Sequence, residues 1–321
     1  MTLARASGSD EMSVPELARR HYERHDLGRH YAARESLSYM LQLPEHGLAG
    51  FVYTWVNGES EAGAALCFYG PAVGEQALFE SVDGIPVPED QPFSDWRVGA
   101  LSLQHGERTE GAFAGDAASI NFTFDGTHPP YNYAAHPDGG LPWMADDRYE
   151  QSGRWRGTLR LRDREIAFDT VSHRDQSWGI RDWGMCQHYR WLQANAGPDV
   201  SINFTQDYVL GHVNVRGYVY RDGEMGQITE LDVDYDLTPD MVHTTLIASI
   251  GDDLGRSTTI RGKTYAHMEF PFPPTTTLVV CSDTVEIDGK PGTAQFDLLW
   301  ASDYVAYVRE HGLPRLPGRE K

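Results

Sequence analysis

Short stretches of alternating hydrophobic and polar residues fill most of the chain from residue 35 to residue 300. A period of two is typical of strands with one buried face and one exposed face. Gly, Pro, Asp and Asn separate the stretches, and pairs such as Asp222-Gly223 and Asp288-Gly289 favour hairpin turns. The expected strands cover residues 36–43, 50–56, 64–69, 76–82, 96–103, 117–125, 157–161 and 165–171, then 189–194, 200–206, 212–221, 228–235, 244–250, 257–269, 277–287 and 290–300.

Many short antiparallel strands at regular spacing predict an all-β protein built from sandwiches or barrels. The pentapeptide Ser-Ile-Asn-Phe-Thr occurs at residues 119–123 and again at 201–205, which would follow from a duplicated domain but also arises by chance. We therefore expect two β domains, residues 35–170 and 171–321. Residues 128–147, rich in Gly, Pro and Asp, are expected to form a long loop of the kind that covers a site.

Helical patterns occur only near the two ends of the chain. Ser13 as an N-cap and Pro15 in the first turn predict short helices within a lead-in of residues 1–34. Residues 301–311 predict a short helix after the last strand.

The formal net charge of −20 disfavours nucleic acid and anionic membrane surfaces as partners, so we expect a neutral or apolar small-molecule substrate. No apolar run is long enough for stable membrane insertion, and charged residues near the N-terminus do not fit a signal peptide. We expect a cytoplasmic protein and leave a homo-oligomer open. Three well-separated cysteines, Cys67, Cys186 and Cys281, fit reduced structural thiols.

Between Ser172 and Trp191 the chain has two His, three Arg, two Asp and three Trp. A solvated loop does not need this mixture and an apolar core does not easily accept it, so we interpret the segment as the floor of a site. Its His and Asp spacing does not match the usual metal-binding patterns, and the chain lacks the motifs of serine hydrolases, P-loop NTPases and dinucleotide-binding folds. We expect no metal and no cofactor.

The run from His173 to Trp183 resembles the R-D-x-S-W-G-x-R-D-W signature of the two-domain lipocalin-like proteins grouped with carotenoid 1,2-hydratase, the AttH-like proteins and kievitone hydratase. Residues 34–37 and 50–55 resemble the opening strands of that family's first domain, and residues 149–158 resemble its last hairpin. The resemblance implies two lipocalin-like (calycin) antiparallel β-barrels. For characterised members it implies addition of water to an isoprenoid double bond, while related proteins are cyclases.

Hydration of an alkene needs a proton donor that is still protonated when the substrate binds, and a carboxylic acid in an apolar pocket meets this need. We predict that Asp175 is this acid. On a strand, His173 would share its face and Arg174 would lie on the other. His173 or Asp182 would orient the attacking water, and Arg174 and Arg181 would supply electrostatic support.

Aromatic faces stabilise a carbocation. Tyr265, His267 and Glu269 alternate along one strand and so would form one polar row, which either faces a barrel lumen and orients a ligand or lies at the surface. The predicted substrate-binding residues are Trp178, Trp183, Tyr189, Trp191, Tyr265, His267, Glu269 and Trp300.

Alternatives remain open for the residues and for the function. Arg174 with Asp182, or Arg181 with Asp175, could form ion pairs that only join two domains. The same acid could drive cyclisation or isomerisation of a terpenoid if water is excluded. A non-catalytic lipocalin-like carrier of a hydrophobic small molecule is the alternative outside enzymes.

Overall fold

The computed structural model describes residues 20–272 and 275–313, which form two antiparallel β-sheets and one α-helix. The strands of the first sheet are β1 (Ala33–Leu43), β2 (Leu48–Asn57), β3 (Glu61–Tyr69), β4 (Leu78–Pro86), β5 (Trp96–Val98), β6 (Leu101–Gln104), β7 (Arg108–Ala114), β8 (Ala118–Gly126), β9 (Tyr131–Asn132), β10 (Asp147–Leu161) and β11 (Arg164–Ile180). The strands of the second sheet are β12 (Cys186–Asn195), β13 (Val200–Val209), β14 (His212–Arg221), β15 (Glu224–Leu237), β16 (His243–Asp252), β17 (Ser257–Phe272), β18 (Thr276–Ile287) and β19 (Lys290–Ala301).

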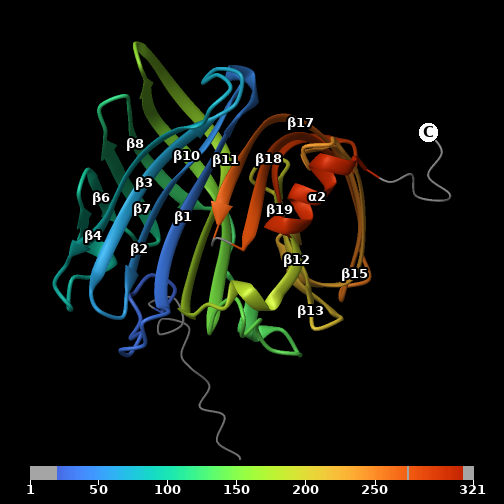
Figure 1. Ribbon diagram of the computed structural model, residues 1–321, viewed down its shortest axis with the longest axis horizontal. Helices are drawn as coiled ribbons and strands as arrows, with labels where there is room; N and C mark the ends of the chain where they lie inside the picture. The colour runs from blue at the N-terminus through green and yellow to red at the C-terminus, as the bar shows by residue number, and fades with distance from the viewer. Residues whose placement is uncertain (1–19, 273–274, 314–321) are drawn as a thin grey trace, which may run out of the picture.

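The two sheets confirm the prediction of an all-β protein with two lipocalin-like barrels. The first sheet has eleven strands in the order β4-β3-β2-β1-β11-β10-β8-β7-β6-β5, with β9 paired to β10, and it curls into a nearly closed barrel. The second sheet is a closed barrel of β12 to β19. The two lie side by side, with β1 and β11 in the middle of the molecule next to the second barrel (Figure 1).

Each sheet encloses its own hydrophobic core, as the alternating pattern requires. Trp155 stacks on Phe122 inside the first sheet, with ring centroids 4.6 Å apart. Phe204 and Phe296 pack inside the second barrel. The opposite faces of β1, β10 and β11 are therefore free to meet the second barrel.

The two sheets divide further along the chain than the expected boundary at residues 170/171. That boundary falls inside β11, which pairs with β10 and β1 and stays in the first sheet as far as Ile180. The second barrel starts at Cys186. The alternating pattern continues through residue 171 without a turn signal, so nothing local marks the change of sheet. The signature therefore lies mostly on the last strand of the first sheet.

The expected loop of residues 128–147 packs against the second barrel. Its Tyr133 hydroxyl donates a hydrogen bond to Asn203 Oδ1 at 2.8 Å, and Trp143 Nε1 donates to Asp207 Oδ2 at 2.6 Å. Tyr131 and Met144 are buried in the same cluster of apolar side chains. The loop thus packs between the first sheet and the second barrel.

Near the ends, the structure agrees with the predictions only in part. The expected helix at residues 301–311 is present as α2 (Ser302–His311). Residues 21–32 form turns and irregular backbone instead of the expected helices, and residues 1–19 lie outside the described residues. The two pentapeptide copies lie on β8 and on β13, the second strand of its barrel, so their positions do not correspond. Within the described ranges, no helix has the length and apolar character needed to cross a membrane.

Candidate active site

His173 and Asp175 lie on the face of β11 that meets the second barrel. Asp175 is opposite Glu150 in the register between β11 and β10. Trp191 of the second barrel donates a hydrogen bond from Nε1 to Glu150 Oε1 at 3.1 Å. This contact places the two carboxyl groups and His173 between the sheets.

Asp175 is almost buried and is ion-paired. Its side chain is 12% exposed, and Arg148 Nη2 lies 3.0 Å from its Oδ2. Burial raises the pKa of Asp175 to about 6, because desolvation and the nearby Glu150 outweigh the attraction of Arg148. A carboxyl group with this pKa is protonated in about half of the molecules at pH 6 and in about a tenth at pH 7.

His173 is fully buried and cannot touch a substrate in this structure. Its Nε2 lies 2.6 Å from Glu150 Oε2, and its Nδ1 lies 3.0 Å from Ser152 Oγ. Burial lowers the pKa of His173, which favours the neutral ring, with Nε2–H donating to Glu150 and Nδ1 accepting from Ser152. Burial raises the pKa of Glu150, but Arg148 and the His173 hydrogen bond outweigh burial and hold it below its usual value. His173 therefore positions Glu150 and is poorly placed as a base.

A third buried carboxyl group comes from the second barrel. Asp297 lies opposite Trp191 in the register of β12 and β19. Its oxygens accept hydrogen bonds from Gln295 Nε2 at 3.1 and 3.2 Å, and no Lys or Arg forms an ion pair with it in the described part of the chain. Burial raises the pKa of Asp297 well above its usual range, and Asp175 acts in the same direction. Two carboxyl groups with raised pKa values thus face the space between the sheets.

Of the four aromatic residues predicted from the signature region, three lie beside this cluster. Trp191 contacts Glu150 as described, and Tyr189 is close enough to Asp175 and Asp297 that both charges act on its hydroxyl. Trp183 is half-buried, with its ring centroid 6.2 Å from that of Tyr189. Trp178 is on the other face of β11 and stacks on His25 at 3.5 Å between ring centroids, so it does not contribute.

The structure places the two predicted arginines in different environments. Arg174 points into the first sheet, where its Nε donates a hydrogen bond to Gln151 Oε1 at 2.8 Å. Arg181 lies on the same side as Asp175, and its Nη2 donates to Ser36 Oγ at 2.8 Å and to Ser177 Oγ at 2.9 Å. Both charges lower the pKa of Asp175, Arg181 more than Arg174, but only Arg181 lies on the same face of β11 as that carboxyl group.

Asp182 is exposed at the turn after β11 and forms no contact with the carboxyl cluster in the described residues. Neither of the alternative ion pairs, Arg174 with Asp182 or Arg181 with Asp175, is formed there. The cation that pairs with Asp175 is Arg148, which local sequence reasoning could not supply because it comes from the neighbouring strand.

The predicted polar row on β17 is divided by an irregularity. The register with β18 shifts between Thr264 and Ala266, which breaks the alternation that would keep Tyr265 with His267 and Glu269. The Tyr265 hydroxyl donates to the carbonyl of Leu48 at 3.2 Å. The prediction of one row facing a barrel lumen is therefore wrong.

His267, Glu269 and Trp300 also lie away from the carboxyl cluster. His267 and Glu269 are exposed, and Glu269 forms an ion pair with Arg309 of α2. Trp300 stacks on His188, with ring centroids 3.8 Å apart. None of the three forms a contact with Asp175 in the described residues.

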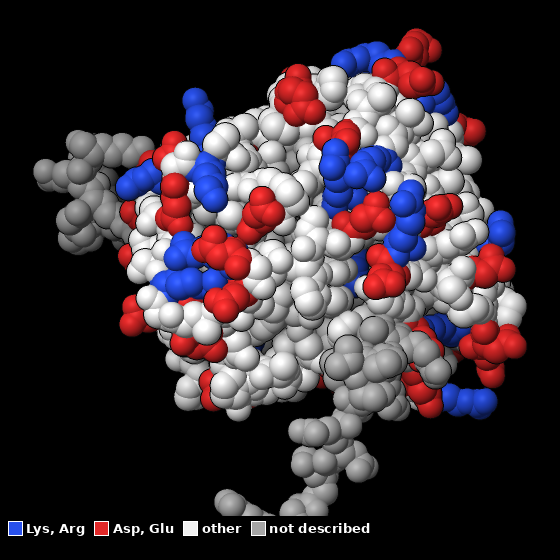
Figure 2. Space-filling view, turned by 180° about the vertical axis from the view of Figure 1, so that it is seen from behind, with Lys and Arg blue, Asp and Glu red and all other residues white. Residues whose placement is uncertain are grey.

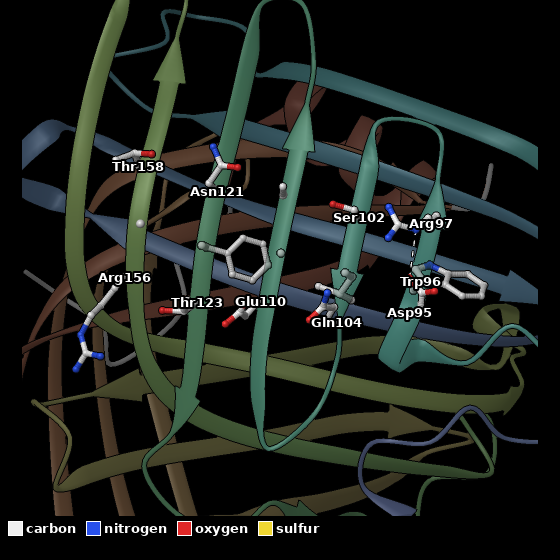
Figure 3. Close-up of a pocket in the computed structure, with 15 residues that line it drawn as sticks. Asp95, Trp96, Arg97, Ser102, Gln104, Glu110, Asn121, Thr123, Arg156 and Thr158 are labelled. Atoms are coloured by element: carbon white, nitrogen blue, oxygen red, sulfur yellow. Dashed lines mark hydrogen bonds and ion pairs between the residues drawn. The ribbon is translucent and has the colours of Figure 1, made fainter.

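Two surface cavities lie away from the carboxyl cluster of Asp175, Glu150 and Asp297. Figure 3 shows one of about 610 Å³ on the first sheet, lined by polar side chains such as Asn121, Thr158 and Arg156 from β8 and β10. Another, of about 670 Å³, is lined by His267 and Glu269 together with Gln76 of the first domain. The described ranges contain no group of three or more His, Cys, Asp or Glu side chains arranged to hold a metal ion.

Sequence reasoning missed two charged residues, Arg148 and Glu150, which are two residues apart on β10. A spacing of two puts such residues on one face of a strand, but this part of β10 is polar on both faces and gave no distinct signal. The spacing does not say which strand lies opposite.

Residues 18–302 match the family described as "Domain of unknown function (DUF7064)". The chain belongs to this family. Among proteins of curated function, none matches the sequence significantly. The DUF7064 chain is similar in structure to a Nitrosomonas europaea protein provisionally named AttH, with a TM-score of 0.65 and 13% identity over 92% of this chain and 98% of that one.

It is also similar to CghA, with a TM-score of 0.58 and 14% identity over 84% of this chain and 89% of that one. At such identities the likeness shows the fold alone. The fold of this DUF7064 protein is therefore AttH-like, and the narrower likeness to carotenoid 1,2-hydratase and kievitone hydratase stays a prediction.

Proposed function

We propose that this protein is an enzyme that adds water to, or removes water from, a carbon–carbon double bond of an apolar terpenoid or prenylated molecule by acid catalysis. Asp175 is the proposed acid. The observation that carries the proposal is the position of this carboxyl group, almost buried between the two sheets with its pKa raised to about 6.

The reaction requires a proton to move from Asp175 to one alkene carbon. The other carbon becomes cationic, water bonds to it, and the proton that this water loses restores Asp175 directly or through solvent. His173 is sealed from the substrate and Asp182 is exposed, so neither is needed as a separate base. The chemistry needs no redox or group-transfer cofactor.

Aromatic side chains next to the acid support the cationic stage. Tyr189, Trp191 and Trp183 lie on the side of the second barrel that faces Asp175. An aromatic face stabilises a desolvated cation by about 2 kcal/mol. If water does not reach the cation, the same residues would promote cyclisation or isomerisation instead.

A carrier without catalytic activity is the second candidate, and one observation favours it. The ion pair between Asp175 and Arg148 would hold a purely structural carboxylate in place, as a scaffold requires. The pKa of about 6 favours the enzyme, because a purely structural ion pair would be expected to lower the pKa of its carboxylate.

Turnover of isoprenoid alkenes by wild-type protein and by Asp175→Asn distinguishes the two. We expect Asp175→Asn to fold, to bind ligand and to lose at least about a hundred-fold in kcat. Asp169→Asn, which changes an exposed carboxylate on the same strand, is the control and should retain full activity. Full turnover by Asp175→Asn would show that the proposed acid is wrong.

A further inference from the structure

Two arginines lie together next to Asp175, on the face of the first sheet that meets the second barrel. The Cζ atom of Arg34 is 4.5 Å from the ring centroid of Trp55 and 5.7 Å from that of Tyr53. Arg181 and Arg34 both act on the Tyr53 hydroxyl, and Asp175 acts on Arg181. The guanidinium groups, the phenol and the proposed acid therefore share one small region.

Neither Arg34 nor Arg181 has a carboxylate partner within residues 20–272 and 275–313. The hydrogen-bond partners of Arg181 are neutral hydroxyl and carbonyl oxygens, and Arg34 rests on aromatic faces. The Nε atom of each is buried and has no acceptor among the described residues. Both side chains are half-buried, and two adjacent guanidinium groups without an acid can both donate hydrogen bonds to one anion.

This local excess of positive charge contrasts with the molecule as a whole. The net charge is −20, and on the face seen in Figure 2 acidic and basic side chains are intermingled. Exposed arginines such as Arg154 are paired with carboxylates, in that case Asp169 at 2.6 Å. Among the described residues Arg34 and Arg181 have no such partner, as is also true of the buried Arg174. What distinguishes Arg34 and Arg181 is that they lie side by side next to Asp175.

The pKa of Tyr53 also reflects the positive charge of Arg34 and Arg181. Burial raises the pKa of Tyr53, but Arg34 and Arg181 outweigh burial and bring it below its usual value. A site that favours a negative oxygen on a buried phenol favours a negative oxygen of a ligand as well.

We propose that Arg34 and Arg181, with the Tyr53 hydroxyl, bind a carboxylate group of the substrate and thereby hold its double bond against Asp175. The inference rests on the proposed function and narrows its substrate to an apolar molecule that carries a carboxylate. It replaces the expectation of a neutral substrate drawn from net charge.

The geometry suits a carboxylate. A guanidinium stacked on an indole keeps its N–H groups in the plane of the stack, where a planar carboxylate can accept two of them. From Trp55 and Tyr53, the same face of β2 continues to Phe51, which is half-buried and would contact an apolar chain. The arginines would thus bind the carboxylate of the substrate, and Phe51 would contact its apolar chain.

Calorimetric titration with geranic acid and with its uncharged methyl ester tests the proposal without relying on turnover. Wild-type protein should bind the acid at least about ten-fold more tightly than the ester. Arg34→Gln and Arg181→Gln should each weaken binding of the acid about ten-fold and leave the ester unchanged. Arg154→Gln removes the same charge from an exposed ion pair and should change neither.

Equal affinity of wild-type protein for acid and ester, or unchanged binding of the acid by Arg34→Gln, would overturn the proposal. Arg34→Gln decides the matter if Arg181→Gln does not fold, because the side chain of Arg34 forms no hydrogen bond among the described residues. Tighter binding of geranyl phosphate than of geranic acid would overturn the choice of a carboxylate.

The test of carboxylate binding and the test of the proposed reaction can fail independently of each other. Asp175→Asn should keep the preference for the acid while losing turnover. If wild-type protein shows this preference but never turns over an alkene, the reaction is refuted and the carboxylate site stands.

Discussion

Arg148 lies 3.0 Å from Asp175, yet the pKa of that carboxyl group is raised to about 6 instead of lowered. The reason is that Arg148 also pairs with Glu150, whose pKa is held down. One cation therefore serves two buried carboxyl groups, and Asp175 is the one whose pKa is raised. This unequal sharing is what makes Asp175 suitable as an acid.

Removal of the shared cation should be strongly destabilising. Arg148→Gln leaves Glu150 and Asp175 buried without a positive partner, and we expect the free energy of unfolding to fall by about 3–5 kcal/mol at pH 7. Urea denaturation measures this loss. Arg154→Gln, at an exposed ion pair, should cost less than about 1 kcal/mol. Equal losses in the two variants would mean that the buried network contributes nothing special.

Asp175→Asn should be more stable than the wild-type protein at alkaline pH. The folded pKa of Asp175, about 6, lies above the usual 3.8, so the wild-type protein loses stability as the pH rises between these values. The loss amounts to about 3 kcal/mol and persists above the upper value. We expect the variant to exceed the wild type by about this amount at pH 8 and to match it near pH 4. Unfolding midpoints at the two pH values give the comparison, and a variant that is less stable at pH 8 would contradict it.

The two glycines of the signature region should differ sharply in their tolerance of a side chain. Gly179 has a φ of +117°, and a Cβ there would lie 2.5 Å from the backbone N of Asp146. We expect Gly179→Ala to lose more than about 2 kcal/mol in urea unfolding. Gly184 has no such conformation or close backbone contact, so Gly184→Ala is the control and should lose less than about 1 kcal/mol. Similar losses would mean that the backbone near Asp146 adjusts freely.

Local pattern was sufficient for most strands and for the faces of β11, but it missed β7, joined β5 and β6 into one strand and found only the end of β10. Period-two alternation predicted the β class, and it separated Arg174 from His173 and Asp175. The same rule places Trp178, four residues after Arg174, with Arg174 on the inner face. Its inclusion among the site residues neglected this alternation.

Local sequence patterns could not predict which strands pair or pack against each other. Glu150 is opposite Asp175 only because β10 and β11 pair in one particular register. Asp297 joins them only because the second barrel packs on the first sheet. The irregularity at Tyr265 is likewise set by how β17 bends against β18. These relations depend on the whole fold, so the cluster's charge balance could not be derived from the signature alone.

The central claim is that Asp175 is a neutral acid when substrate binds, and its protonation state can be measured directly. Infrared difference spectra of wild-type protein minus Asp175→Asn, recorded between pH 4 and pH 9, report the protonated carboxyl band of this one residue. We predict that the band is present at pH 5 and disappears with an apparent pKa of about 6. Absence of the band throughout, with carboxylate already at pH 4.5, would contradict the account and leave Asp175 as the structural partner of Arg148.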